Sequence, residues 1–211
     1  MAFVASSCTS GLVKRIKFTC TLLNLVPFLS VLPEESALWI LYSFGLPALA
    51  FAAAARLFRR QKDDYLVGIL ESGAIAFVTA TINLEIREYF GDFLDLQTRM
   101  TLTEVSLHSL SWMLTGTALY YRDALRPRTV HRVASRLLLG VAGGTVAGAH
   151  LVLLNPFAGE AITGVPVFNT LLLAYLAPAI CTAILAYLGA RAGKTRFARL
   201  AAFAAAALAF L

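Results

Sequence analysis

Long apolar runs separated by short polar gaps are the dominant pattern of this chain of 211 residues. A helix of about twenty apolar residues crosses the hydrocarbon core of a bilayer, and the runs lack the alternation that barrel strands require. The pattern therefore predicts an all-α, polytopic transmembrane helix bundle of about six to seven spans. The last run, of fifteen residues, is short and indicates a truncated span. The runs occupy residues 18–32, 36–55, 65–83, 104–121, 133–154, 168–188 and 197–211.

The gaps between these runs are alternately rich and poor in lysine and arginine. Four of the 18 cations lie at 56–64, five at 122–136 and four at 189–199, whereas 84–103 has two and 155–169 has none. Cytoplasmic loops of membrane proteins accumulate Lys and Arg. The alternation therefore predicts a multi-pass protein with its N-terminus in the cytoplasm.

Composition supports a membrane protein and narrows its partners. Charged residues make up 14% of the chain, against about 25% in a soluble domain. The net charge of +6 is the sum of the cytoplasmic loops, so we expect no nucleic-acid partner. Neither the three cysteines nor the three histidines have metal-binding or disulfide spacing, which predicts no metal and no cofactor. The expected partners are the lipid bilayer, and other membrane proteins or further copies of the chain.

Two regions follow from these patterns. Residues 1–35 form a basic N-terminal segment with a weak first span, which Asn24 and Pro27 interrupt. Residues 36–211 form a single helix bundle, which we expect to be incomplete because its last run is short. Between the third and fourth runs, residues 84–103 mix aromatic and charged residues irregularly, as is typical of a segment at the outer membrane interface.

One acidic residue lies inside a predicted span. An Asp, Lys or Arg at the centre of a span costs about 2.5–3.5 kcal/mol on insertion scales, so an ionisable residue there needs a physical reason. Glu71 lies six residues into the third run. It would serve as a proton or cation relay or, in the alternative, as a protonated or hydrogen-bonded group that fixes helix packing.

The fourth run carries a polar stripe, whose members fall on one helix face. Glu104 and His108 are four residues apart and would share a proton. In the alternative, the stripe is a polar seam that holds this helix to its neighbours. The stripe consists of Glu104, His108, Ser111, Thr115 and Arg122.

Six polar residues are expected near the outer end of the bundle: Arg87, Glu104, His108, His150, Asn155 and Glu160. Together they would bind a polar or anionic headgroup or sugar, or would form the wet rim of the bundle. The sequence contains no Gly-x-Ser-x-Gly motif and no phosphate-binding glycine loop, so we assign no catalytic residue.

Glycine and proline add two backbone features. Gly140, Gly144 and Gly148 recur on one helix face and predict close packing with a neighbouring helix. Pro178 predicts a kink in the sixth run that frees the carbonyl of Ala174, which a neighbour or Thr182 would satisfy.

Several stretches resemble a large bacterial family of polytopic "predicted membrane proteins" of unknown function. They are Leu84-Glu85-Ile86-Arg87-Glu88-Tyr89-Phe90, residues 104–116, Asn155-Pro156-Phe157 with Gly159-Glu160, and residues 169–178. The resemblance covers about residues 36–211, with no clear counterpart for 1–32. Members of that family are usually far longer, so the chain resembles a fragment or a short member. The resemblance implies a helix bundle in the inner membrane and no particular activity.

Three functions fit these observations. The favoured one is a non-catalytic structural or assembly component of the envelope, because the sequence contains no recognisable catalytic set. The alternative is a transporter or permeation module that uses Glu71, the polar stripe and the break at Pro178. A second alternative is an intramembrane enzyme that acts on a lipid-linked substrate with Glu104 and His108 as an acid–base pair.

Overall fold

The computed structural model describes residues 38–91, 99–154 and 169–210, and every element within them is helical. The chain forms two compact units, whose boundary falls inside one long helix, between Thr81 and Ile82. The elements in chain order are α3 (Leu38–Ile40), η1 (Leu41–Gly45), α4 (Leu46–Gln61), α5 (Tyr65–Phe90), α6 (Leu102–Leu125), α7 (Thr129–Thr145), η2 (Val146–Leu153), η4 (Leu172–Leu176), α8 (Ala177–Arg191) and α9 (Thr195–Phe210), where η denotes a π-helical segment.

Four helical stretches among the described residues are long and apolar enough to cross a membrane. They are Leu41–Gln61, Tyr65–Phe90, Thr129–Leu153 and Leu172–Arg191. This agrees with a polytopic helical membrane protein, but the expected count of six to seven spans is not confirmed. The first apolar run lies outside the described residues. Helix α6 contains too many polar residues to qualify, and α9 has only 16 residues.

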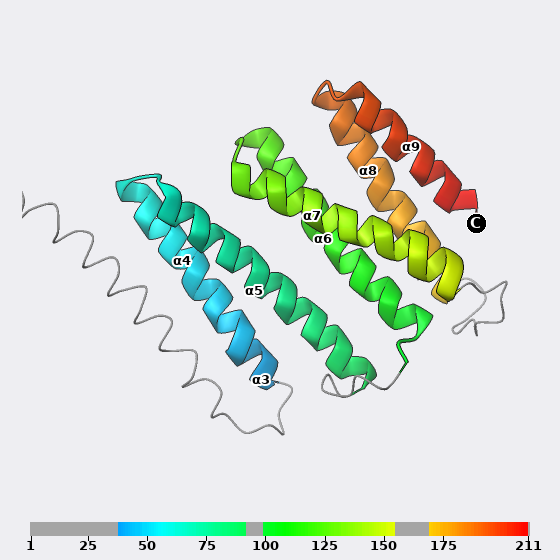
Figure 1. The fold of residues 1–211 in the computed structure, drawn as a ribbon, viewed down its shortest axis with the longest axis horizontal. Coiled ribbons are helices and arrows are strands. Elements are labelled where there is room, and N and C mark those ends of the chain that lie inside the picture. The colour runs from blue at the N-terminus through cyan, green and yellow to red at the C-terminus, as the bar shows by residue number, and fades with distance from the viewer. Residues whose placement is uncertain (1–37, 92–98, 155–168, 211) are drawn as a thin grey trace, which may run out of the picture. The chain divides into compact units, whose positions relative to one another are not determined.

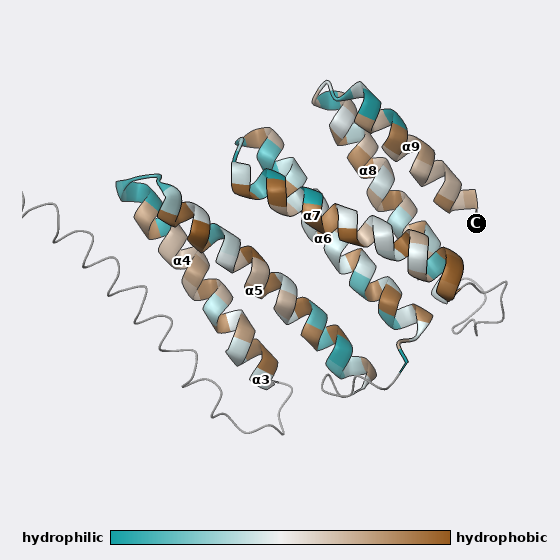
Figure 2. Cartoon of the chain, viewed as in Figure 1, coloured by the Kyte–Doolittle hydropathy of each residue, from teal (hydrophilic) through white to brown (hydrophobic). Residues whose placement is uncertain are grey.

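The helices pair into three hairpins, α4 with α5, α6 with α7, and α8 with α9 (Figure 1). The connecting turns at 62–64, 126–128 and 192–194 fall in the three gaps that are richest in lysine and arginine. Figure 2 shows hydrophilic residues gathered at these turns and apolar residues along the helices. In the third turn Gly193 adopts φ 71°, a left-handed conformation that ends α8.

A glycine on one helix of each hairpin receives a large side chain from the other helix. A Cβ atom added at each glycine would lie 2.8 Å from that side chain, which is closer than real contacts allow. The hairpin partners therefore approach each other more closely than two larger residues would permit. The pairs are Gly73 with Phe51, Gly116 with Leu139, and Gly189 with Phe197.

Helix α6 forms the centre of the second unit. Its face with Leu102, Ser106 and Ser109 is fully or almost fully buried. Both serine hydroxyls donate to backbone carbonyls of α6 itself, so they bury no unsatisfied polar group. A helix that is enclosed by protein in this way tolerates more polar residues than a helix that faces lipid.

Helix α5 is longer than the third apolar run. The run ends at Asn83, whereas α5 continues as a helix through Phe90. The location of residues 84–103 at the membrane interface stays a prediction. The side chain of Arg87, which made this stretch resemble an interface, is buried. Hydropathy alone does not distinguish an arginine at the membrane surface from one that is paired inside a helix bundle.

Asp123 fixes the turn between α6 and α7. Its carboxylate accepts hydrogen bonds from the backbone N–H of Arg128 at 2.9 Å and from Nε of Arg132 at 3.2 Å. Burial alone would raise the pKa of Asp123, but these two hydrogen bonds and the positive charges of Arg132 and Lys194 together lower it. The charged form of Asp123 therefore stabilises the folded hairpin.

We expect Gly116→Ala to lower the free energy of unfolding by about 1–3 kcal/mol, because the added methyl group would overlap Leu139. The matched control is Gly144→Ala on α7, where nothing lies within 4 Å of the added atom. That control should be neutral or slightly stabilising, since alanine is the better helix former. Unfolding of the purified protein in detergent measures both, and equal stability of the two variants would contradict the close approach at Gly116.

We expect Asp123→Ala to lower the free energy of unfolding by about 1–3 kcal/mol at pH 7. Because the pKa of Asp123 is lowered in the folded state, its contribution is complete above the ordinary value of about 4 and disappears as the pH falls through the folded value. The free energies of unfolding of the two proteins should therefore converge as the pH falls below the folded-state pKa of Asp123. A stability difference that persists unchanged in acid would show that the charge of Asp123 is irrelevant.

Candidate functional site

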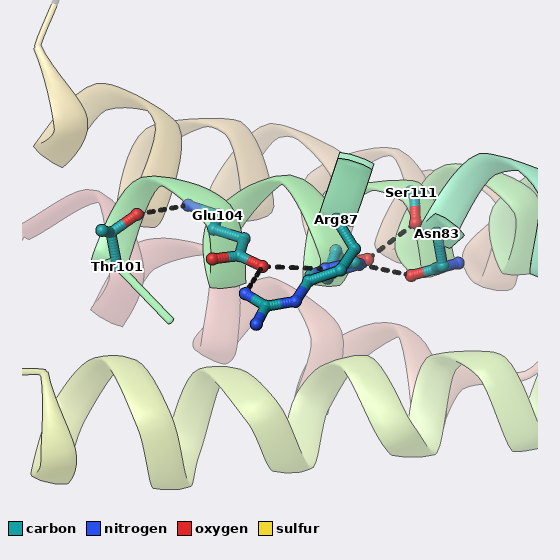
Figure 3. A network of polar contacts seen from close by, with 6 residues as sticks. Asn83, Arg87, Thr101, Glu104 and Ser111 are labelled. Carbon is teal, nitrogen blue, oxygen red and sulfur yellow. Dashed lines mark hydrogen bonds and ion pairs between the residues drawn. The ribbon is translucent and has the colours of Figure 1, made fainter. Parts of the chain in front are cut away.

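A buried ion pair joins the C-terminal part of α5 to the N-terminal part of α6 (Figure 3). Nη1 of Arg87 donates to Oε1 of Glu104 at 2.8 Å, and both side chains are less than a tenth exposed. Both residues belong to the second unit. The two opposite charges therefore lie in direct contact in a largely buried place.

A histidine completes the cluster. Nδ1 of His108 lies 2.6 Å from Oδ1 of Asn83. Because an amide oxygen only accepts, Nδ1 carries the hydrogen in this arrangement. The other ring nitrogen, Nε2, is buried without a hydrogen-bond partner among the described residues and lies 3.9 Å from Oε1 of Glu104. The ring stacks on Trp112, with 5.9 Å between the centroids.

The cluster consists of two polar pairs at helical spacing. Asn83 and Arg87 are four residues apart on α5, and Glu104 and His108 are four residues apart on α6. They pair in reverse order, Asn83 with His108 and Arg87 with Glu104, as antiparallel helices require. The polar contacts therefore specify one register of the two helices.

Local contacts hold the α6 members of the cluster in place. The hydroxyl of Thr101, the residue that caps α6, accepts from the backbone N–H of Glu104 at 3.3 Å. The position of Glu104 in the first turn of α6 is also favourable for a negative charge. Ser111 donates to the carbonyl of His108 at 2.8 Å.

His150 lies at a second polar site, where the π-helical segments η2 and η4 meet. Its Nδ1 donates to the carbonyl of Ala174 at 3.0 Å, and the hydroxyl of Tyr175 donates to the carbonyl of His150 at 2.9 Å. Ala174 lies four residues before Pro178, so its carbonyl is the one that the proline leaves without its helical donor. His150, and not Thr182, supplies that donor; Thr182 donates to Pro178 and Ala179 instead.

The structure brings together Arg87, Glu104 and His108, three of the residues expected near one end of the bundle. Their functional roles stay predictions. Asn155 and Glu160 lie outside the described residues. The structure does not add His150 to the hydrogen bonds of the cluster, although the His150 ring lies beside the backbone carbonyl of Val105 on the same helix α6. Farther along α6 the polar stripe becomes half-buried and then exposed at Arg122.

Two other predictions have different outcomes. Glu71 belongs to the first unit, where it forms an ion pair with Arg59 of α4 at 2.9 Å. Gly140, Gly144 and Gly148 are exposed, with nothing within 4 Å of an added Cβ atom, so no described helix packs on them. Their close packing against a helix stays a prediction. The predicted region 1–35 lies outside the described residues.

Sequence reasoning missed Asn83 and Tyr175. Asn83 was the last residue of a predicted span, and only its spacing of four from Arg87 could have indicated that it shares a helix face with that residue. Tyr175 had no distinguishing pattern. In the described part of the chain, no group of three or more His, Cys, Asp or Glu side chains is arranged to hold a metal ion.

Comparison with known proteins agrees with this architecture. No curated protein and no solved structure matches the chain significantly. A family model described as "Predicted membrane protein (DUF2339)" matches residues 1–211. The similarity therefore includes residues 1–32, which have no clear counterpart in the resemblance described from the sequence. The chain therefore belongs to the DUF2339 family of predicted membrane proteins.

Proposed function

We propose that this chain is a non-catalytic structural module of the bacterial inner membrane, which supports the assembly of a larger envelope complex. One observation carries the proposal. Among the described residues, each buried Asp, Glu or Arg side chain has an oppositely charged partner in its own unit. The pairs are Glu71 with Arg59, Arg87 with Glu104, and Asp123 with Arg132.

Paired charges of this kind favour a structural role. A catalytic acid or an ion-binding group must be open to its substrate, whereas here each carboxylate is occupied by a guanidinium group. Buried ion pairs add little net stability, but they disfavour other arrangements because a shifted register would leave charges unpaired. The polar contacts of α5 and α6 therefore suit a module whose task is to hold helices in one arrangement.

The topology belongs to the same proposal. Helix α6 crosses the membrane with its polar face turned into the protein, and α9 completes the third hairpin. The four candidate spans, α6, α9 and the first apolar run together make seven spans. In this topology the N-terminus and the three turns lie in the cytoplasm. The lysine- and arginine-rich composition of those turns supports this orientation. Other membrane proteins, or further copies of the chain, would cover the exposed apolar faces.

Cysteine labelling in whole cells tests the orientation. In a variant without the native cysteines, Tyr89→Cys lies at the outer end of α5 and Leu125→Cys at the inner end of α6; both positions are exposed. A membrane-impermeant thiol reagent should label position 89 in intact cells and position 125 only after lysis. Labelling of position 125 in intact cells, with position 89 protected, would reverse the topology.

Replacement of the buried pair tests the structural role. Arg87→Met or Glu104→Leu alone should lower the free energy of unfolding by about 3–5 kcal/mol, because each leaves one buried charge unpaired. The double variant should recover most of the lost free energy of unfolding. After chemical cross-linking in membranes, it should be linked to the same proteins as the wild type. Arg122→Met, which removes an exposed arginine from the same helix, is the matched control.

The same double variant separates the proposal from its alternatives. If it is stable but has lost a proton or solute flux that the wild type shows in proteoliposomes, the transporter function replaces the structural one. Turnover of a lipid-linked substrate by the wild type that stops in this variant would favour the intramembrane enzyme. An equally unstable double variant would show that the pair does not act by mutual neutralisation.

A further inference from the structure

We propose that Nε2 of His108 is a proton-binding site, and that a proton bound there competes with Arg87 for the carboxylate of Glu104. The proposal goes beyond the structural role and does not depend on it. It rests on three features of the α5–α6 cluster: the fixed tautomer of the histidine, the position of its second nitrogen, and the single oxygen that two groups approach.

The hydrogen bond to Asn83 determines which nitrogen can take up a proton. Because Nδ1 of His108 already donates to Oδ1 of Asn83, the basic lone pair of the neutral ring lies on Nε2. Nε2 has no hydrogen-bond partner among the described residues, and the His108 side chain is only a tenth exposed. The lone pair of this buried nitrogen therefore accepts no hydrogen bond from a described residue and can bind a proton.

Two charged groups lie near the ring of His108. Glu104 from α6 and Arg87 from α5 are the charged groups that act on the ring. Two other helices bring uncharged residues to α6. Ala142 of α7 and Cys181 of α8 pack with Met113 of α6. Segment η2 brings His150, whose ring lies beside the backbone carbonyl of Val105. Among the described residues, Glu104 is therefore the counter-charge that acts on protonated His108.

Glu104 is already paired with Arg87. Oε1 of Glu104 accepts from Arg87 at 2.8 Å and lies 3.9 Å from Nε2 of His108, about 1 Å too far for a hydrogen bond. When Nε2 binds a proton, two cations face one carboxylate in a buried site. Movement of Glu104 toward the imidazolium weakens its bond to Arg87, and with it the contact between the end of α5 and α6.

His150 provides an internal control. Its Nδ1 also donates to an oxygen that only accepts, the carbonyl of Ala174, so it has the same tautomer as His108. No carboxylate is among the groups that act on its ring. A response that is specific to the cluster should therefore appear at His108 and be absent at His150.

The experiment is a pH titration of the full chain, labelled with ¹⁵N-histidine and ¹⁵N-arginine, in lipid nanodiscs and followed by NMR. Single His→Gln variants assign the three histidines, and Arg87→Lys assigns Arg87. At pH 8 we expect His108 to carry its hydrogen on Nδ1. On acidification we expect Nε2 to become protonated and the Arg87 signal to shift with the same midpoint.

Glu104→Gln should weaken proton binding at His108 by about tenfold or more, because the carboxylate that stabilises the imidazolium is gone, and should leave His150 unchanged. The proposal is overturned if His108 carries its hydrogen on Nε2 at pH 8, or if Arg87 does not respond when His108 is protonated. An unchanged His108 midpoint in a folded Glu104→Gln protein also overturns it. Should that variant not fold, the wild-type tautomer and the Arg87 response decide alone.

Discussion

A charge that leaves water must be neutralised by the protein, and the second unit depends on how Arg87 and Glu104 meet this requirement. Their contact joins the end of one helix to the start of the next. It agrees with the continuation of α5 past the apolar run, because Arg87 in that extension is buried and paired with Glu104 of the next helix. It also accounts for the polarity of the first turns of α6, where Glu104 is buried against protein.

Close backbone approach meets a second requirement, which is van der Waals contact between helices that gain no hydrophobic energy from leaving lipid. Each hairpin has one glycine at the point where a large side chain of the partner helix crosses it. Polar pairing therefore sets the register of α5 on α6, while glycine sets the distance within each hairpin. The glycine series of α7 and η2, which consists of Gly140, Gly144 and Gly148, takes no part in these contacts.

The sequence predicted helices well, because a run of apolar residues has one stable conformation in a bilayer, and the gap composition marked the hairpin turns. It failed where the outcome depends on a partner distant in the chain. The ion pair of Arg87 with Glu104 was not predicted, because the two residues lie 17 positions apart on different helices. The close approach at Gly116 was not predicted, because a single glycine has no periodicity. Close packing was predicted at Gly140, Gly144 and Gly148, which recur at a spacing of four but face open space. Periodicity identifies a helix face but not what covers that face.

Structural and proton-binding roles are compatible in this cluster because both use the same oxygen of Glu104. With His108 neutral, the cluster holds one positive and one negative charge, and the register of α5 and α6 is specified. With His108 protonated, the same carboxylate serves two cations, so the contact that fixes the helices is the one that loosens. His150 has the same tautomer but holds the carbonyl that Pro178 leaves free, and no carboxylate acts on its ring. The two histidines therefore differ in one respect. A carboxylate lies near the free nitrogen of His108, whose contact can loosen on protonation, and none acts on the ring of His150.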